Sequence, residues 1–110
     1  MPRGYEVTLV QLKPAAAGKM RQRIPPNLRV IVLDERGRDL STRQFAALLA
    51  EPTAFLIGGA EGLDPSLKRE ASLLLRLSAL TLPHALAQVV LCEQLYRAAT
   101  LLTGHPYHRE

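Results

Sequence analysis

The chain is poor in cysteine and aromatic residues. Of its 110 residues, one is cysteine (Cys92), none is tryptophan, and aromatic residues make up 5%. A single cysteine cannot form an internal disulfide, and this usage fits a reducing compartment. Because Cys92 is flanked by Leu91 and Leu95, we predict that it is a small buried hydrophobe rather than a reactive thiol.

Several further features are missing. No pair of cysteine and histidine residues has metal-ligand spacing, which argues against a metal site. No apolar run is long enough to cross a bilayer. Residues 1–6 carry no apolar stretch of the kind that a secretory signal needs. We therefore expect a cytoplasmic protein without metal or membrane partner, folded as one domain over residues 1–110.

Positive charge is concentrated in the first half of the chain. Residues 1–50 hold nine basic and four acidic residues, a net charge of +5, whereas residues 51–110 have a net charge of −1. A basic, arginine-rich half is a candidate surface for a polyanion. An ordinary solvated surface explains the same charges equally well.

Hydrophobic patterns and turn residues predict an alternation of strands and helices. The predicted strands cover residues 5–12, 28–34, 54–57 and 76–82. The predicted helices cover 42–50 with Ser41 as N-cap, from 64 or 66 to about 75, and 85–102 with Gly104 at the C-terminal cap, with a loop over 13–27 and a turn over 35–38. This order predicts an α/β fold with a mainly parallel sheet.

The last predicted helix has apolar residues on most of its circumference. A helix of this kind must be covered on more than one side. Its own sheet can cover one side, and a second copy of the chain is the simplest cover for the other. We therefore expect a homodimer built partly on this helix.

A glycine-rich segment, residues 58–62, follows the predicted strand 54–57. Glycines at this position allow a ligand to approach the backbone beyond the end of a parallel strand. The segment lacks the dinucleotide and phosphate-loop patterns, and a tight turn is the favoured explanation of its glycines.

Two polar stretches stand near the C-terminus. Ser78 and Thr81 have no acid or cysteine spaced to activate them, so a hydrolytic triad is not expected. Residues 105–109 offer imidazoles, a phenol and a guanidinium. These groups suit binding or catalysis, or they dock the C-terminus for stability.

Four segments taken together indicate a function far more specifically than any of these features does alone. Residues 55–63, 77–84, 93–98 and 105–110 resemble, in order and spacing, the small bacterial ribosomal RNA large-subunit pseudouridine N3-methyltransferases of the SPOUT superfamily. The resemblance extends from about residue 28 to the end. It implies a SPOUT-type parallel sheet with helices on both faces and a deep C-terminal trefoil knot, an exception to the rule that chains do not thread loops.

The resemblance also implies a cofactor, S-adenosyl-L-methionine, bound in the knotted crevice. The residues that would hold it are Leu33, Gly58, Leu77, Ser78, Ala79, Leu80, Thr81 and Leu82. Members of this family act as homodimers in which the C-terminal tail of one subunit completes the pocket of the other. This agrees with the apolar circumference of the last helix.

The implied reaction methylates N3 of a pseudouridine in a 23S rRNA hairpin of the ribosome. We expect His108 or His105 to assist proton transfer and Tyr107 to pack on the base, while Arg97 and Arg109 hold phosphate or the developing imide charge. The chain departs from the family in its N-terminal part, where a strand-helix unit is expected to be absent. A knotted cofactor- or RNA-binding module that has lost turnover is therefore the alternative.

Overall fold

The computed structural model describes residues 23–58, 65–104 and 107. The elements follow the order β1 (Arg29–Arg38), α1 (Thr42–Ala47), the 3₁₀ helix η2 (Leu48–Ala50), β2 (Thr53–Leu56), α2 (Pro65–Glu70), β3 (Leu73–Leu75) and α3 (His84–Thr103). This order confirms the predicted alternation of strands and helices. The predicted strand 5–12 and most of the predicted loop 13–27 lie outside the described residues.

The sheet is parallel, with β1 in the centre. Its strand order is β2-β1-β3, and β1 pairs in parallel with both neighbours. Val32 is opposite Leu56 on β2, and Leu33 is opposite Leu75 on β3. The C-terminal ends of the strands therefore lie at the same edge of the sheet. In parallel sheets this edge is where ligands bind.

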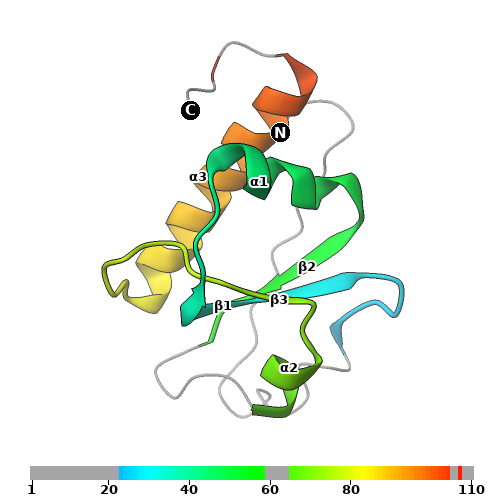
Figure 1. Cartoon of the computed structure of the whole chain (residues 1–110), viewed down its shortest axis with the longest axis vertical. Helices are drawn as coiled ribbons and strands as arrows, with labels where there is room; N and C mark the ends of the chain where they lie inside the picture. Colours follow the sequence, from blue (N-terminus) through cyan, green and yellow to red (C-terminus); the bar gives the residue numbers. More distant parts are fainter. Residues whose placement is uncertain (1–22, 59–64, 105–106, 108–110) are drawn as a thin grey trace.

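Helices cover both faces of the sheet (Figure 1), so the predicted α/β layers are confirmed. Ile31 and Val32 are adjacent on β1 and both are fully buried. Ile31 packs with Phe45 of α1 and Leu95 of α3, whereas Val32 packs with Leu67 of α2. Alternate residues of a strand point to opposite faces, which accounts for an uninterrupted apolar run in this strand.

The helix ends follow local sequence signals. Ser41 is the N-cap of α1: its Oγ accepts the N–H of Gln44, whose side chain accepts the N–H of Ser41. This is a capping box. At the other end of the chain, Gly104 adopts the left-handed conformation (φ 77°) and closes α3, as glycine does at many helix ends. Both predicted caps are confirmed.

The predicted turn over residues 35–38 is wrong, because β1 continues through it. Arg38 pairs with Leu75 after an irregularity that follows Leu33. Gly37 allows this, since a Cβ there would lie 2.6 Å from the carbonyl carbon of Leu74 and 2.7 Å from that of Leu75. The strand bends because glycine permits two backbones to approach closely.

The predicted end of the second helix near Leu75 and the predicted strand 76–82 are also wrong. The helix α2 ends at Glu70 rather than near Leu75, and the last strand is Leu73–Leu75 rather than 76–82. Leu73 and Leu75 pack on one core cluster and Leu74 on the other, so these leucines follow the two-residue period of a strand. Beyond Leu75 the partner strand β1 has ended, and residues 76–82 run as a loop.

The predicted burial of Cys92 is wrong as well, since this residue is exposed. The buried residues of α3 are Leu91, Leu95, Ala98, Ala99 and Thr100. Among the helices of the described residues, none has the length and apolar character to span a bilayer.

Candidate functional site

Three of the predicted cofactor segments meet at the C-terminal edge of the sheet. Leu33 lies on β1 immediately after the pairing of Val32 with Leu56, and Gly58 follows β2 by two residues. Leu77 follows β3 by two residues, and both Leu33 and Leu77 pack against the core beneath α1 and α3. The parallel topology is what brings these distant segments together.

A hydrogen-bonded contact joins two of the segments directly. The Nδ1 atom of His84, the first residue of α3, lies 2.8 Å from the carbonyl oxygen of Gly58. Because that oxygen can only accept, Nδ1 carries the hydrogen in this contact. The imidazole therefore fixes the start of α3 to the glycine turn that follows β2.

The main-chain N–H and C=O groups of the loop 77–82 lie outside the helices and strands. Within the described part of the chain, none of its residues forms a backbone-to-backbone hydrogen bond. Ser78 Oγ accepts the N–H of Leu80 at 3.0 Å, which makes a local turn. Leu80 is 77% exposed, and Leu82 is half-buried. The loop combines unpaired main-chain groups with apolar side chains, as an adenosine pocket requires.

A shallow cleft adjoins this loop on the side of α1. Its lining comprises Leu40, Ser41, Thr42, Phe45, Leu75, Arg76, Leu77 and Gln94. The Arg76 guanidinium donates two hydrogen bonds to Asp39, Nε to Oδ1 at 2.6 Å and Nη2 to Oδ2 at 2.5 Å. This contact lowers the pKa of Asp39 and raises that of Arg76. The bidentate pair fixes Arg76, which immediately precedes the loop 77–82, to Asp39, which immediately follows β1.

The C-terminal tail is described at one residue, Tyr107, which contacts α3. Its hydroxyl donates to Glu93 Oε1 at 3.1 Å. Its ring meets the ring of Tyr96 edge to face, with centroids 4.6 Å apart, and the Arg97 Cζ lies 5.3 Å from its centroid. The hydrogen bond to the negative carboxylate raises the pKa of Tyr107. The predicted residues Arg97 and Tyr107 are thus adjacent.

Three other predicted site residues, His105, His108 and Arg109, lie outside the described residues. Arg97 is engaged by Glu93, which accepts from its Nε at 3.0 Å and from its Nη2 at 2.5 Å. This ion pair raises the pKa of Arg97. The described residues contain no group of three side chains suited to a metal ion.

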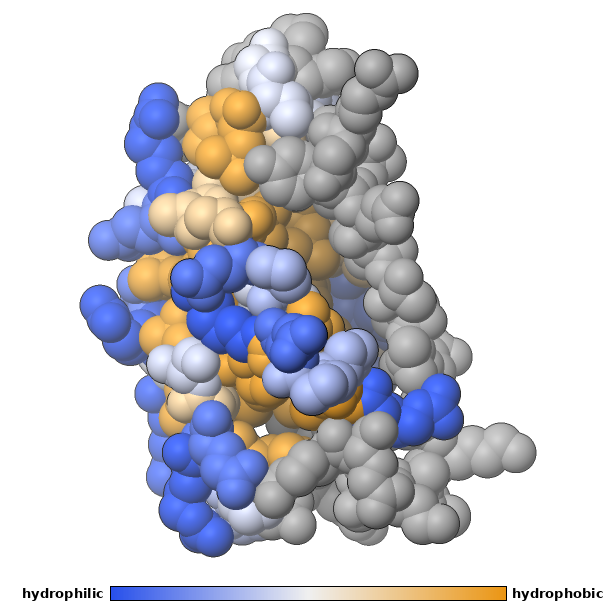
Figure 2. Space-filling view, turned by 90° about the vertical axis from the view of Figure 1, so that its right-hand side faces the viewer, coloured by the Kyte–Doolittle hydropathy of each residue, from blue (hydrophilic) through white to orange (hydrophobic). Residues whose placement is uncertain are grey.

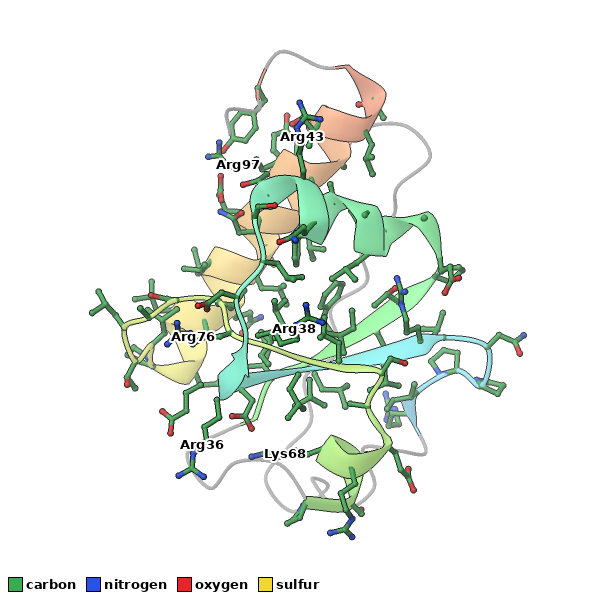
Figure 3. All side chains as sticks on the ribbon, viewed as in Figure 1. Arg36, Arg38, Arg43, Lys68, Arg76 and Arg97 are labelled. Atoms are coloured by element: carbon green, nitrogen blue, oxygen red, sulfur yellow. The ribbon has the colours of Figure 1, made fainter. Side chains whose placement is uncertain are left out.

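The basic side chains fall into two groups. Lys68, Arg76 and Arg97 form ion pairs with Asp34, Asp39 and Glu93. Arg36 and Arg38 are exposed and form no ion pair within residues 23–58 and 65–104. In Figure 3, Arg97 projects from α3 at the end where the chain terminates, and Arg36 and Lys68 lie on the α2 side of the sheet.

Hydrophilic residues lie along the left edge of Figure 2, which is the side that faces the viewer in Figure 1, and others lie across the middle of this view. An arginine in an ion pair is held by its carboxylate partner. An exposed arginine without an ion pair can instead bind a phosphate backbone. Among the described residues, Arg36 and Arg38 are therefore candidate phosphate contacts.

Two residues that the sequence interpretation did not assign belong to this site. No role was predicted for His84, the first residue of α3, although it closes the family segment 77–84. Glu93 was part of the family segment 93–98, yet only Arg97 was given a role. Glu93 and Arg97 are spaced i,i+4, which is the spacing of an ion pair on one face of a helix, and this was the available signal for Glu93.

Comparisons with known proteins agree with this geometry. A family model described as "Predicted SPOUT methyltransferase" matches residues 4–108. Relatives named "Ribosomal RNA large subunit methyltransferase H" are similar over most of the chain. One from Polynucleobacter asymbioticus is 51% identical and the alignment covers all of this chain and 82% of the relative.

Two further relatives carry the same name. One from Polynucleobacter necessarius subsp. necessarius is 58% identical over 86% of this chain and 74% of its own length. One from Nitrosospira multiformis is 43% identical over 99% of this chain and 83% of its own length. With the parallel sheet and helices on both faces, these matches show that the chain belongs to the SPOUT methyltransferase family.

Proposed function

We propose that this protein is a ribosomal RNA methyltransferase that uses S-adenosyl-L-methionine to methylate N3 of a pseudouridine in 23S rRNA. The observation that carries the proposal is the meeting of Leu33, Gly58 and Leu77 at the C-terminal edge of a parallel sheet. The names of the relatives support the substrate class.

The residues at this edge fit the cofactor chemically. Leu33 and Leu77 supply apolar walls, and the main-chain groups of the loop 77–82 supply donors and acceptors for an adenine edge. Ser78, Ala79, Leu80, Thr81 and Leu82 are the proposed loop contacts. S-adenosyl-L-methionine supplies the methyl group that the reaction transfers.

The chain itself must prepare the acceptor. N3 of pseudouridine is an imide nitrogen, so it must lose its proton before it can attack a methyl group. We assign the removal of this proton to His108 or His105, because imidazole is the side chain that most often acts as a general base in enzymes. Arg97 and Arg109 stabilise the negative charge left on the imide, and Tyr107 packs on the base. The base must be exposed or flipped to reach these groups.

The homodimer belongs to this proposal. The buried side of α3 faces α1 and the sheet, whereas Leu86 and Val89 on another side are 47% and 63% exposed. Exposed apolar side chains on one helix mark a contact surface. We place the second copy there, and we assign the tail of one subunit to the pocket of the other.

Two finer features complete the proposal. A trefoil knot, formed where α3 passes through the preceding loop, would hold the loops 58–62 and 77–82 around the cofactor. The exposed Arg36 and Arg38 would contact rRNA phosphates near the same edge of the sheet.

The test uses two assays in sequence. Calorimetry with S-adenosyl-L-methionine measures cofactor binding, and incubation with ribosomes that lack the mark measures methyl transfer to N3. We expect binding followed by stoichiometric transfer. Binding without transfer would instead favour a cofactor- or RNA-binding module that has lost turnover. Transfer to another base would contradict the assigned substrate.

A further inference from the structure

One carboxylate connects the tail, the basic group and the cleft. Glu93 Oε1 accepts hydrogen bonds from the Tyr107 hydroxyl and from the Nε and Nη2 atoms of Arg97. Its second oxygen, Oε2, accepts from Gln94 Nε2 at 2.7 Å. Both oxygens of Glu93 are therefore occupied by side chains of its own subunit.

This arrangement restricts the ring of Tyr107 on several sides. The Tyr96 ring meets it at an interplanar angle of 71°, and the Arg97 guanidinium lies near it within the range of a cation–π contact. The carboxylate fixes the hydroxyl at the far end of the ring. Tyr107 lies between His105 and His108 in the sequence.

The Glu93 carboxylate also bonds a residue of the cleft, Gln94. Gln94 lines the cleft that also includes Arg76 and Leu77. Arg76 is in turn fixed to Asp39 at the end of β1. Glu93 is thus bonded both to Tyr107 of the tail and to Gln94, a residue of the cleft wall.

We propose that Glu93 is a positioning residue for the methyl transfer. It orients Tyr107 and Arg97 of its own subunit, and its second oxygen holds Gln94. This inference rests on the proposed function, because it assigns a role within the same reaction. Glu93 itself need not touch the base or the cofactor.

The network is better suited to alignment than to stability. The side chains of Arg97 and Glu93 are 25% and 34% exposed, and exposed ion pairs contribute little to the free energy of folding. Misplacement of a reacting group by about 1 Å can lower a rate by about a hundredfold. Loss of Glu93 should therefore affect turnover far more than folding.

The experiment compares Glu93→Ala and Glu93→Gln with the wild type. For each protein we measure the kcat and KM on unmethylated ribosomes, the Kd for S-adenosyl-L-methionine and the midpoint of thermal unfolding. We expect kcat of Glu93→Ala to fall about a hundredfold, with cofactor affinity and unfolding unchanged. Glu93→Gln keeps an acceptor oxygen and should recover part of the rate. Glu70→Ala, which removes an acid from α2, is the matched control.

A double-mutant cycle isolates the contact with the tail. Tyr107→Phe removes the hydroxyl, and if Glu93 acts through it, the combination with Glu93→Gln will be less harmful than the sum of the two single effects. Wild-type kcat in Glu93→Ala, or a fall explained by lost cofactor binding or unfolding, would overturn the inference.

A second readout does not depend on turnover. The ring resonances of Tyr107, assigned by comparison with Tyr107→Phe, should shift toward those of a free tyrosine in Glu93→Ala. Unchanged resonances would show that Glu93 does not hold the ring. If the wild type binds the cofactor but transfers no methyl group, the proposed function fails, while this measurement still decides whether Glu93 positions the tail.

Discussion

His84 Nδ1 lies 2.8 Å from the carbonyl oxygen of Gly58, so the first residue of α3 is bonded to the turn after β2. The two residues are 26 positions apart in the sequence. The contact therefore joins the segment after β2 to the start of α3, beside one side of the proposed cofactor edge.

Replacing this histidine should weaken cofactor binding. We expect His84→Ala to raise the Kd for S-adenosyl-L-methionine about fivefold, which corresponds to the net free energy of one hydrogen bond. Calorimetry measures this directly. His84→Asn places an amide N–H close to the position of Nδ1 and should restore most of the affinity. Equal affinity for His84→Ala and wild type would show that the contact does not shape the site.

Local signals in the sequence were enough to predict most of the elements. Ser41 and Gly104 mark helix ends by side-chain and backbone chemistry that needs no distant partner. The apolar run at Ile31 and Val32 predicts a strand that is buried on both faces. Alternation of such segments was sufficient for the α/β assignment.

The errors arise where a distant segment decides the outcome. Residues 65–75 are rich in good helix formers, yet Leu73–Leu75 are recruited into the sheet by β1. The bend at Gly37 depends on the backbone of β3, and no local pattern shows it. The contact of Tyr107 with Glu93 joins the tail to a helix 14 residues earlier, so sequence alone could not place it.

Gly37 should not tolerate any side chain. Its Cβ position lies 2.6 Å from a backbone carbon and 2.7 Å from a backbone oxygen of Leu74, and backbone atoms of a paired strand cannot move aside cheaply. We expect Gly37→Ala to lower the free energy of unfolding by about 1–3 kcal/mol, the usual cost of overpacking. Urea denaturation measures the change.

Gly104→Asn serves as the control for this substitution. Gly104 has no atom within 4 Å of a Cβ, and asparagine tolerates its left-handed backbone. This variant should lose much less stability than Gly37→Ala. If both lose the same amount, the close approach of β1 and β3 is not the reason that glycine is required at position 37.

Val89 should be part of the dimer interface. It is 63% exposed on α3, near Leu86, and a carboxylate there would be buried without a partner in the proposed dimer. We expect Val89→Glu to weaken self-association by about 3 kcal/mol, or about a hundredfold in Kd.

Sedimentation at several protein concentrations measures this association. Ala47→Glu, at an exposed position of α1, adds the same charge away from the proposed interface and should leave the dimer intact. A Val89→Glu variant that sediments as wild type does would place the interface elsewhere.

Asp34 should make a pH-dependent contribution to stability. Its side chain is 8% exposed and lies 2.8 Å from Lys68 Nζ, and its Oδ1 accepts the N–H of Arg36 at 2.7 Å. The hydrogen bond from Lys68 is the main cause of a pKa lowered from the usual 3.8, followed by the bond from Arg36. A carboxylate with a lowered pKa stabilises the fold above its unfolded pKa, and this contribution is lost as the pH falls through the folded value.

Asp34→Asn tests this dependence. At neutral pH we expect the variant to lose about 1–2 kcal/mol of unfolding free energy, because it removes a charged hydrogen bond to Lys68 and keeps an acceptor for Arg36. The difference from wild type should shrink as the pH falls below about 4. Chemical denaturation over this pH range measures both values, and Glu35→Gln, an exposed neighbour, should show little change at any pH. A difference that stays constant down to the lowest pH would show that the Asp34 charge does not stabilise the contact between β1 and α2.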